Sequence, residues 1–305
     1  MQMGENVLSM AFQQHHTVYL RNIHLFLSKV YYDILYGEDD LLISDYLKLT
    51  RFKKMETEWI NHEKAQCLNH YNCDQEVCSI HVVKQAIQQH PVFNHLLFSY
   101  LGDEASTEHM RQFLLGEAVL NVEFFDYLVL AVIGASDEAK AEIVTNIWDE
   151  AGRSDIRKFH TNLFKRLLFD MGLQYNRDEC IATMSWEGLA GINLFSYLAI
   201  YSFNKMKFFG LLAATELLDP PHYHQLNKGL IRLFPKKNVN RIYYVEHETL
   251  DVEHADGWLN RVILPELARR PHKTRDFWLG FYLRLNSVKK YYDQLLTTFM
   301  VKQAA

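Results

Sequence analysis

Three side chains that commonly bind metals follow one another near the carboxyl end of this chain. His247, Asp251 and His254 lie in the stretch YYVEHETLDVEHADGW, with the spacing H-x3-D-x2-H. In an α-helix, residues three, four or seven positions apart lie on one face, within about 60° of each other at about 100° per residue. Two imidazoles and a carboxylate suit iron or manganese better than metals that prefer thiolates. The spacing therefore predicts half of a non-haem metal site.

The other half of such a site must come from other helices, because dinuclear sites take side chains that project inward from several helices. Glu216 lies in the apolar stretch FFGLLAATELLDPP and Glu123 in VLNVEFFDYLVL, while Glu150 and His160 flank Gly152. A carboxylate buried among apolar residues costs several kcal/mol unless it is paired, protonated or bound to a metal. We interpret these residues as candidate ligands; pairing with Arg or Lys is the alternative for each acid.

The interval between Glu150 and His160 makes a further prediction. Ten residues along a straight helix would place them about 80° and about three turns apart. Gly152 predicts a helix break that redirects one of the two side chains. A ferritin-like bundle carries Glu-x-x-His on each of two helices. Here Asp251-x-x-His254 is the one credible inward pair of that kind, which argues against a ferritin-like architecture.

Composition restricts the class of protein. The chain has 305 residues, of which 49% are hydrophobic, and this is enough for a substantial core. A formal net charge of −5 gives no reason to expect nucleic acid as a partner. The opening MQMGENVLSM lacks the features of a signal peptide, and the most apolar long stretch contains Asn, Lys and Glu. We therefore expect a soluble, cytoplasmic protein without membrane association.

The pattern of apolar residues predicts an all-α protein. Apolar residues recur at three- and four-residue intervals, and only 6 prolines and 13 glycines interrupt them. Pro220 and Pro221 predict the end of a long helix. Residues 1–85 hold three of the four cysteines and six of the histidines. We interpret them as an N-terminal helical extension, the expected contact layer of a homodimer, packed on a helical domain over 86–305.

Five potential zinc ligands lie within the stretch CLNHYNCDQEVCSIH. Structural zinc sites usually separate two pairs of ligands by a longer loop, and this cluster is more compact. We interpret it as a junction between helices with free thiols, and zinc binding is the alternative. The five residues are Cys67, His70, Cys73, Cys78 and His81.

The chain from about residue 90 to about residue 300 resembles the haem-oxygenase-like diiron oxidases and oxygenases. These iron-containing redox enzymes have the haem-oxygenase fold but use no haem. The resemblance rests on the H-x3-D-x2-H motif, on a Glu some thirty residues upstream, and on a Glu and a His from an earlier helix. It implies a haem-oxygenase-like helical bundle that holds two Fe2+ ions, the second weakly in many members. The implied ligands are Glu150, His160, Glu216, His247, Asp251 and His254.

The ten-residue interval between Glu150 and His160 is similar to that of the N-oxygenase branch, which has an additional carboxylate about one helix earlier. Glu123 is the best match to that seventh ligand. Lys205 lies eleven residues before Glu216 and returns to nearly the same helical face. It is a candidate anchor for a substrate carboxylate, and a lysine at a helix end is the alternative.

The resemblance implies an enzyme that activates O2 as co-substrate through a peroxo-bridged diferric state. We expect a small amino-acid-like substrate and N-oxygenation, with oxidative C–C cleavage or decarboxylation of an amino acid or fatty acid as the alternative. A cofactor-independent haem-oxygenase-like enzyme, of the thiamin-salvage or quinone-cofactor type, would instead contact substrate with its acids. A non-enzymatic helical interaction protein would turn Glu150, Glu216 and Asp251 to solvent or to basic partners.

Overall fold

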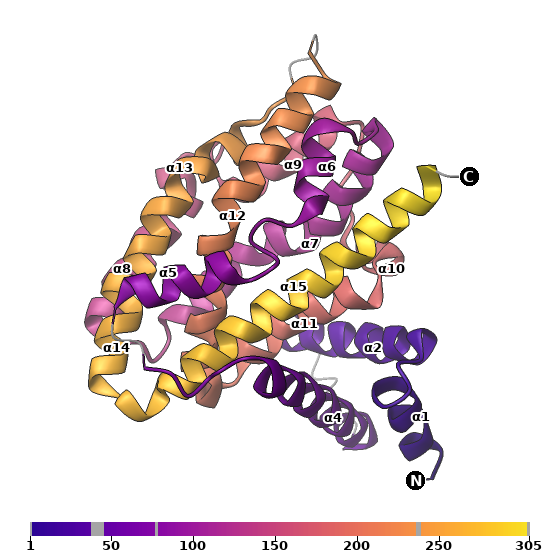
Figure 1. Ribbon diagram of the computed structural model, residues 1–305, viewed down its shortest axis with the longest axis vertical. Helices are drawn as coiled ribbons and strands as arrows, with labels where there is room; N and C mark the ends of the chain where they lie inside the picture. Colours follow the sequence, from indigo (N-terminus) through magenta and orange to yellow (C-terminus); the bar gives the residue numbers. More distant parts are fainter. Residues whose placement is uncertain (1, 38–45, 77–78, 236–238, 304–305) are drawn as a thin grey trace.

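The computed structural model describes residues 2–37, 46–76, 79–235 and 239–303, and every regular element within them is a helix (Figure 1). The all-α prediction is confirmed. The longer helices are α1 (Gln2–Phe12), α2 (Thr17–Tyr36), α4 (Tyr46–His70), α5 (Ile80–Gln89), α6 (Leu96–Asp103), α7 (Thr107–Val132), α8 (Asp137–Glu150), α9 (His160–Asp170), α10 (Arg177–Thr183), α11 (Trp186–Ile200), α12 (Lys205–Leu233), α13 (Ile242–Gly257), α14 (Leu264–Arg269) and α15 (Thr274–Gln303).

Helix α12 lies at the centre of the bundle and packs along α6, α13 and α15 (Figure 1). Glycines allow α12 and α15 to cross closely. A Cβ atom on Gly210 would lie 2.9 Å from the backbone nitrogen of Phe281, and one on Gly280 would overlap the backbone of Lys207. Close packing holds α12 in one position, and α12 carries one of the predicted ligands, Glu216.

The predicted helix end at Pro220 and Pro221 is wrong, because α12 continues through both prolines to Leu233. Proline removes a backbone N–H and disfavours a helix interior. Tertiary contacts on the far side of the prolines hold the helix together. The His222 ring lies 3.7 Å from the ring of Phe98, measured between centroids, and its Nε2 lies 3.1 Å from the carbonyl oxygen of Val92.

The predicted break at Gly152 is confirmed. Helix α8 ends at Glu150, a short 3-10 turn η1 (Gly152–Ser154) follows, and α9 begins at His160. Gly152, Arg153 and Ser154 have φ values of 62°, 54° and 70°. Three successive left-handed residues reverse the chain sharply, and for non-glycine residues this backbone is unfavourable. The turn brings Glu150 and His160 toward one another from the ends of two different helices.

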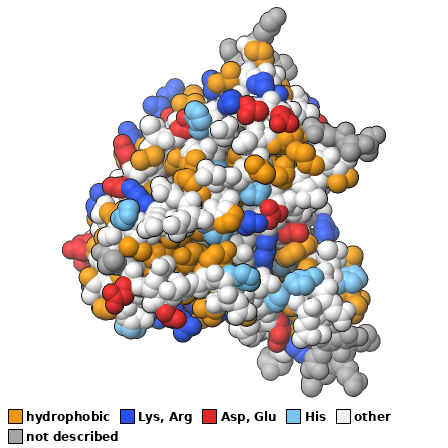
Figure 2. Space-filling view, viewed as in Figure 1, with side chains coloured by type: hydrophobic (Ala, Val, Ile, Leu, Met, Phe, Trp, Pro, Cys, Tyr) orange, Lys and Arg blue, Asp and Glu red, His pale blue; other side chains and the backbone are white. Residues whose placement is uncertain are grey.

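The N-terminal helices pack on α11 and α15 through α2 and α4. Polar contacts join the two parts: the buried Asn193 amide donates to the carbonyl oxygen of His24, and Lys290 forms a partly buried pair with Glu63 at 2.8 Å. A groove of about 540 Å³ runs along this junction, and Figure 2 shows histidines gathered on this side of the molecule. The division at residue 85 and the homodimer stay predictions.

The cysteine-rich segment spans the end of α4 and the start of α5. Cys67 and Cys73 are buried free thiols, and burial raises the pKa of Cys73 to about 11. Cys78 lies outside the described residues. The described members of this segment form no group that could hold a metal. Across the same described ranges, no helix is long and apolar enough to cross a membrane.

Candidate metal centre

Six of the predicted ligands lie in two buried groups of three. The first group, from here on triad one, takes its members from α8, α9 and α13; triad two takes its members from α12 and α13. Within each triad, one ligand atom per residue lies within 4.8 Å of the others, close enough to share a metal ion. Triad one is Glu150, His160 and His247, and triad two is Glu216, Asp251 and His254.

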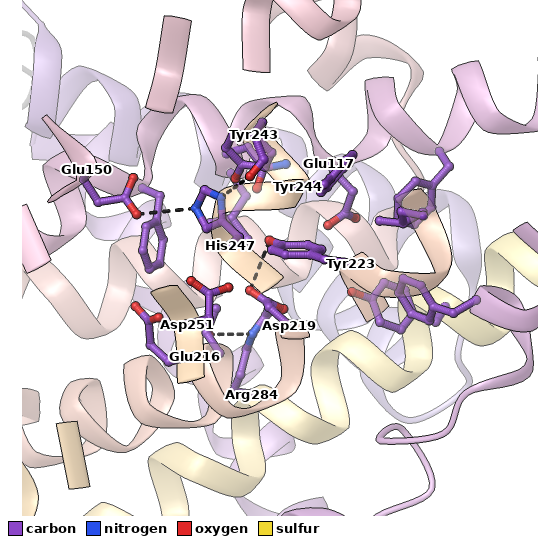
Figure 3. Close-up of a pocket in the computed structure, with 18 residues that line it drawn as sticks. Glu117, Glu150, Glu216, Asp219, Tyr223, Tyr243, Tyr244, His247, Asp251 and Arg284 are labelled. Carbon is purple, nitrogen blue, oxygen red and sulfur yellow. Dashed lines mark hydrogen bonds and ion pairs between the residues drawn. The ribbon is translucent and has the colours of Figure 1, made fainter. Parts of the chain in front are cut away.

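Triad one is compact around the carboxylate of Glu150. Nδ1 of His160 lies 2.9 Å from Oε2 of Glu150, and Nε2 of His247 lies 3.5 Å from Oε1. The two imidazole nitrogens are 3.2 Å apart. All three residues are at most 5% exposed, so bulk water does not compete for their lone pairs. Figure 3 shows His247 between Glu150 and the tyrosines of α13.

Triad two joins α12 to the same face of α13. Nδ1 of His254 lies 3.6 Å from Oε2 of Glu216 and 4.0 Å from Oδ1 of Asp251. These separations are too long for hydrogen bonds, and Nδ1 is a buried nitrogen without a hydrogen-bond partner. A buried polar atom left unpaired is costly, and a metal between the three side chains would satisfy it.

Each histidine is held by a contact to its other ring nitrogen. Nδ1 of His247 lies 2.6 Å from the backbone carbonyl oxygen of Tyr243, which leaves Nε2 for a metal. Nε2 of His160 lies 3.5 Å from Glu246, which leaves Nδ1. Outer contacts of this kind fix the tautomer and orientation of metal-binding histidines. The residues present therefore fit two metal ions.

The second ring nitrogen of His254 contacts a carboxylate that is itself held by an arginine. Its Nε2 lies 3.3 Å from Oδ2 of Asp149, and Nε of Arg153 donates to Oδ1 of the same carboxylate at 2.7 Å. Arg153 is one of the left-handed residues of the turn after α8. The turn that positions Glu150 and His160 of triad one thus also supports His254 of triad two.

The Asp149→Asn variant is expected to weaken metal binding in triad two by about 10- to 100-fold, because His254 loses its charged acceptor. Competition with a chelator of known affinity would measure this for each of the two sites. Asp155→Asn is the matched control, because Asp155 lies in the same connection but pairs with exposed Arg157. If Asp149→Asn and the unchanged protein bound metal in triad two with equal affinity, Asp149 would have no role in positioning His254.

The pKa shifts of the triad residues favour bound protons that partly offset the charge of the carboxylates. Burial alone would raise the pKa of Glu150, but His160 and His247 beside it lower that pKa below its usual range. Burial would lower the pKa of His254, but Glu216 and Glu150 raise it to about 9. Burial and then the charge of Glu216 raise the pKa of Asp251 well above its usual value. Binding of a cation would release these protons.

Both triads face one cavity of about 30 Å³, room for two or three water molecules (Figure 3). Its lining includes four of the ligands together with Glu117, Asp219 and Arg284. Burial raises the pKa of Glu117 to about 7. Glu117 and Asp219 were missed from the sequence as residues of the site. Asp219 lies three residues after Glu216 on α12, and this spacing indicates that the two acids share one face of the helix.

Glu123 does not lie with the triads. Its Oε1 accepts from Nε of Arg177 at 2.6 Å, and its Oε2 is 3.5 Å from the hydroxyl of Tyr127. Burial raises the pKa of Glu123, and Arg177 lowers it in part. Glu123 therefore pairs with an arginine, which was the alternative considered for each acid. It belongs to neither triad, so its prediction as a seventh ligand does not fit this geometry.

Lys205 likewise lies away from the lining of the cavity. Its Nζ donates to the carbonyl oxygens of Leu130 at 3.1 Å and Ala131 at 3.4 Å, in the last turn of α7. A cation at this end of a helix is favourable, because carbonyl groups there lack partners. Burial lowers the pKa of Lys205 to about 8. The prediction as substrate anchor is corrected: Lys205 caps α7.

Comparisons with known proteins agree with the predicted family. The model for the family described as iron-containing redox enzyme, of haem-oxygenase type, matches residues 111–289. No curated protein matches. A crystal structure at 2.00 Å resolution of a CADD-like protein of unknown function from Nostoc punctiforme is similar in fold. It is 17% identical, with a TM-score of 0.57, over 72% of this chain and 97% of that one.

A second structure with the same description, at 1.35 Å resolution, gives 16% identity and a TM-score of 0.55 over 73% of this chain and 96% of that one. At these identities the likeness concerns the fold alone, and it confirms the predicted haem-oxygenase-like bundle. The family match supports a conclusion about the family as well as the fold, because it covers more than half of the 305 residues and includes the six residues of both triads. This chain belongs to the family of iron-containing redox enzymes.

Proposed function

We propose that this protein is an O2-dependent, non-haem diiron oxidase or oxygenase that acts on a small amino-acid-like substrate, with N-oxygenation as its reaction. The observation that carries the proposal is the pair of buried triads, which share α13 and face one cavity. Membership of an iron-containing redox family supports the choice of iron. Imidazole and carboxylate ligands also suit iron.

In this proposal each triad holds one ferrous ion. The two ions would supply the two electrons that, with two protons, let one oxygen atom of O2 enter the substrate while the other leaves as water. The protein positions the ligands and excludes water. Tyr223 and Tyr243 pack against His247, and Tyr244 packs against both tyrosines. Phe113 and Phe124 of α7 also line the cavity.

The cavity favours a polar substrate over a long acyl chain. Glu117, Asp219 and Arg284 line it beside the ligands, so an acyl chain there would bury charged groups against methylenes. This supports a reaction on an amine or amino acid over decarboxylation of a fatty acid. Oxidative cleavage of an amino acid remains the alternative reaction, and product analysis distinguishes the two.

The interpretation as an interaction protein required the acids to face solvent or basic partners. Instead Glu150, Glu216 and Asp251 are 5%, 4% and 3% exposed, and each lies in a triad with histidine. The cofactor-independent interpretation requires that no metal binds. Measuring metal binding therefore separates it from the diiron proposal.

The test is an anaerobic titration of the metal-free protein with Fe2+, followed by exposure to O2. We expect two ions per chain, a fold that is more stable by about 2.7 kcal/mol for each site at iron concentrations a hundredfold above its Kd, and a transient absorbance in the visible. A primary amine should speed the decay of that transient and yield a hydroxylamine. Protein loaded with redox-inactive Zn2+ is the control, and it should consume no O2. Absence of iron binding would overturn the proposal.

A further inference from the structure

The cavity has a polar end that the two triads do not use. It is formed by Glu117 from α7, Asp219 from α12, Tyr244 from α13 and Arg284 from α15 (Figure 3). Neither acid belongs to a group that could hold a metal, as far as the described residues show. These four residues, here called the polar end, come from four helices, so the fold itself brings them together.

Two groups of the polar end lack partners. Glu117 makes no hydrogen bond or ion pair to any described residue, although its carboxylate opens into the cavity. The hydroxyl of Tyr244 is buried without a hydrogen-bond partner, and Tyr244 is 0% exposed. A buried hydroxyl without a partner is unfavourable, and a hydrogen bond to water or a ligand would remove that cost. Both groups can accept a hydrogen bond from a molecule in the cavity.

The remaining members of the polar end are already positioned by the protein. Asp219 accepts a hydrogen bond from Tyr223 at 3.2 Å, which leaves further lone pairs on its carboxylate. Nε of Arg284 donates to Oγ1 of Thr215 at 3.0 Å, and its guanidinium lies 5.1 Å from the ring centre of Phe195. Two carboxylates against one guanidinium leave the polar end with one negative charge in excess when all three are ionised.

We propose that the polar end binds the protonated amino group of the substrate, with Glu117, Asp219 and the Tyr244 hydroxyl as its three acceptors. An alkylammonium group has three N–H donors and a single positive charge, which match three acceptors and the excess charge. It is also compact enough for a cavity of about 30 Å³, whereas the rest of a substrate requires side chains of the lining to move. This inference rests on the proposed function, because it places the amine beside the triads. For N-oxygenation the bound ammonium must then pass one proton to the carboxylate of Glu117 or Asp219, which frees the lone pair that forms the N–O bond.

Charge interactions support the same assignment. Burial raises the pKa of Glu117 to about 7, and only Arg284 lowers it in part. A buried carboxylate that is only partly compensated favours a nearby cation. A carboxylate ligand would instead meet two acids of its own charge, with a single guanidinium to offset them.

The test measures binding without turnover, so it does not depend on the proposed reaction. Butylammonium, butyrate and 1-butanol would be titrated into the iron-loaded protein without O2, at about pH 8, where the amine and the acids are charged. The three probes share one alkyl chain, so the cost of opening the cavity is similar for each. We expect butylammonium to bind at least about tenfold more tightly than butyrate, as one charged hydrogen bond implies.

Two variants assign this preference to the polar end. Glu117→Gln should lose about tenfold or more in affinity for butylammonium, with unchanged iron content and little change for 1-butanol. Tyr244→Phe removes a hydroxyl that has no partner, so it should keep its stability and lose several-fold in affinity for butylammonium. Asp126→Asn, an exposed acid on the same helix, is the control and should behave as the unchanged protein.

Three results would overturn the inference. Butyrate binding as tightly as butylammonium, or an unchanged preference in both Glu117→Gln and Tyr244→Phe, would show that the polar end does not select a cation. A fall in iron content in Glu117→Gln would make Glu117 a metal ligand instead. If no iron binds but the preference for butylammonium holds, the proposed function fails while the ammonium site stands.

Discussion

The His254→Ala variant is expected to bind about one iron per chain, whereas two are expected for the unchanged protein. His254 supplies the imidazole of triad two, and its removal leaves the carboxylates of Glu216 and Asp251 facing each other in a buried site. Loss of an outer partner alone typically weakens a metal site 10- to 100-fold, so loss of a ligand should weaken it by more than about 100-fold. Iron quantitation after gel filtration measures the effect.

His224→Ala is the control for this prediction. His224 is an exposed histidine on α12 that lies 3.6 Å from Glu248, and it contacts neither triad. It should keep two irons per chain. Two irons in His254→Ala would contradict the assignment of triad two, and His247→Ala should show the reciprocal loss from triad one.

The motif on α13 predicted three candidate ligands, but not that these residues divide between two triads. The spacing of His247, Asp251 and His254 was sufficient to predict one buried helical face, and the structure confirms that all three are buried. The residues nevertheless divide, with His247 in triad one and the other two in triad two. The division depends on where α9 and α12 approach α13, and long-range packing of this kind cannot be read from spacing.

The acids of α7 show why a residue type in an apolar helix is not enough. Glu117 and Glu123 are six residues apart, so they point about 120° away from each other on the helix. Both lie among apolar residues in the sequence. Glu117 reaches the cavity because α7 turns that face to α12 and α13, whereas Glu123 faces Arg177 of α10. The position of α10 therefore determines that Glu123 pairs with Arg177 and does not reach the cavity.

The ends of α12 illustrate the same limit. Lys205 lies on the predicted helical face, yet at the first residue of α12 it reaches the carbonyl groups that end α7. Pro220 and Pro221 predicted a helix end from local preference, and contacts of His222 with α6 and the segment before it override that preference. Local signals were reliable at Gly152, where the chain needs backbone angles that glycine adopts most easily.

The Gly152→Ala variant is expected to lose the metal of triad one and several kcal/mol of stability. Gly152 has a φ of 62°, which disfavours alanine by about 1–2 kcal/mol. A Cβ atom there would also lie 2.6 Å from the backbone nitrogen of Phe159 and 2.7 Å from the carbonyl oxygen of Lys158. Backbone cannot move aside as a flexible side chain would, so the chain just before His160 must shift.

Gly134→Ala separates the two causes, because Gly134 has a φ of 77° but open space where a Cβ atom would be placed. It should lose about 1–2 kcal/mol from backbone strain and keep both metals. Urea unfolding and iron quantitation of the two variants measure the difference. If Gly152→Ala matched Gly134→Ala in both stability and iron content, the turn between α8 and α9 would tolerate displacement. The 2.9 Å approach of His160 to Glu150 would then not depend on the close contact between Gly152 and the chain before His160.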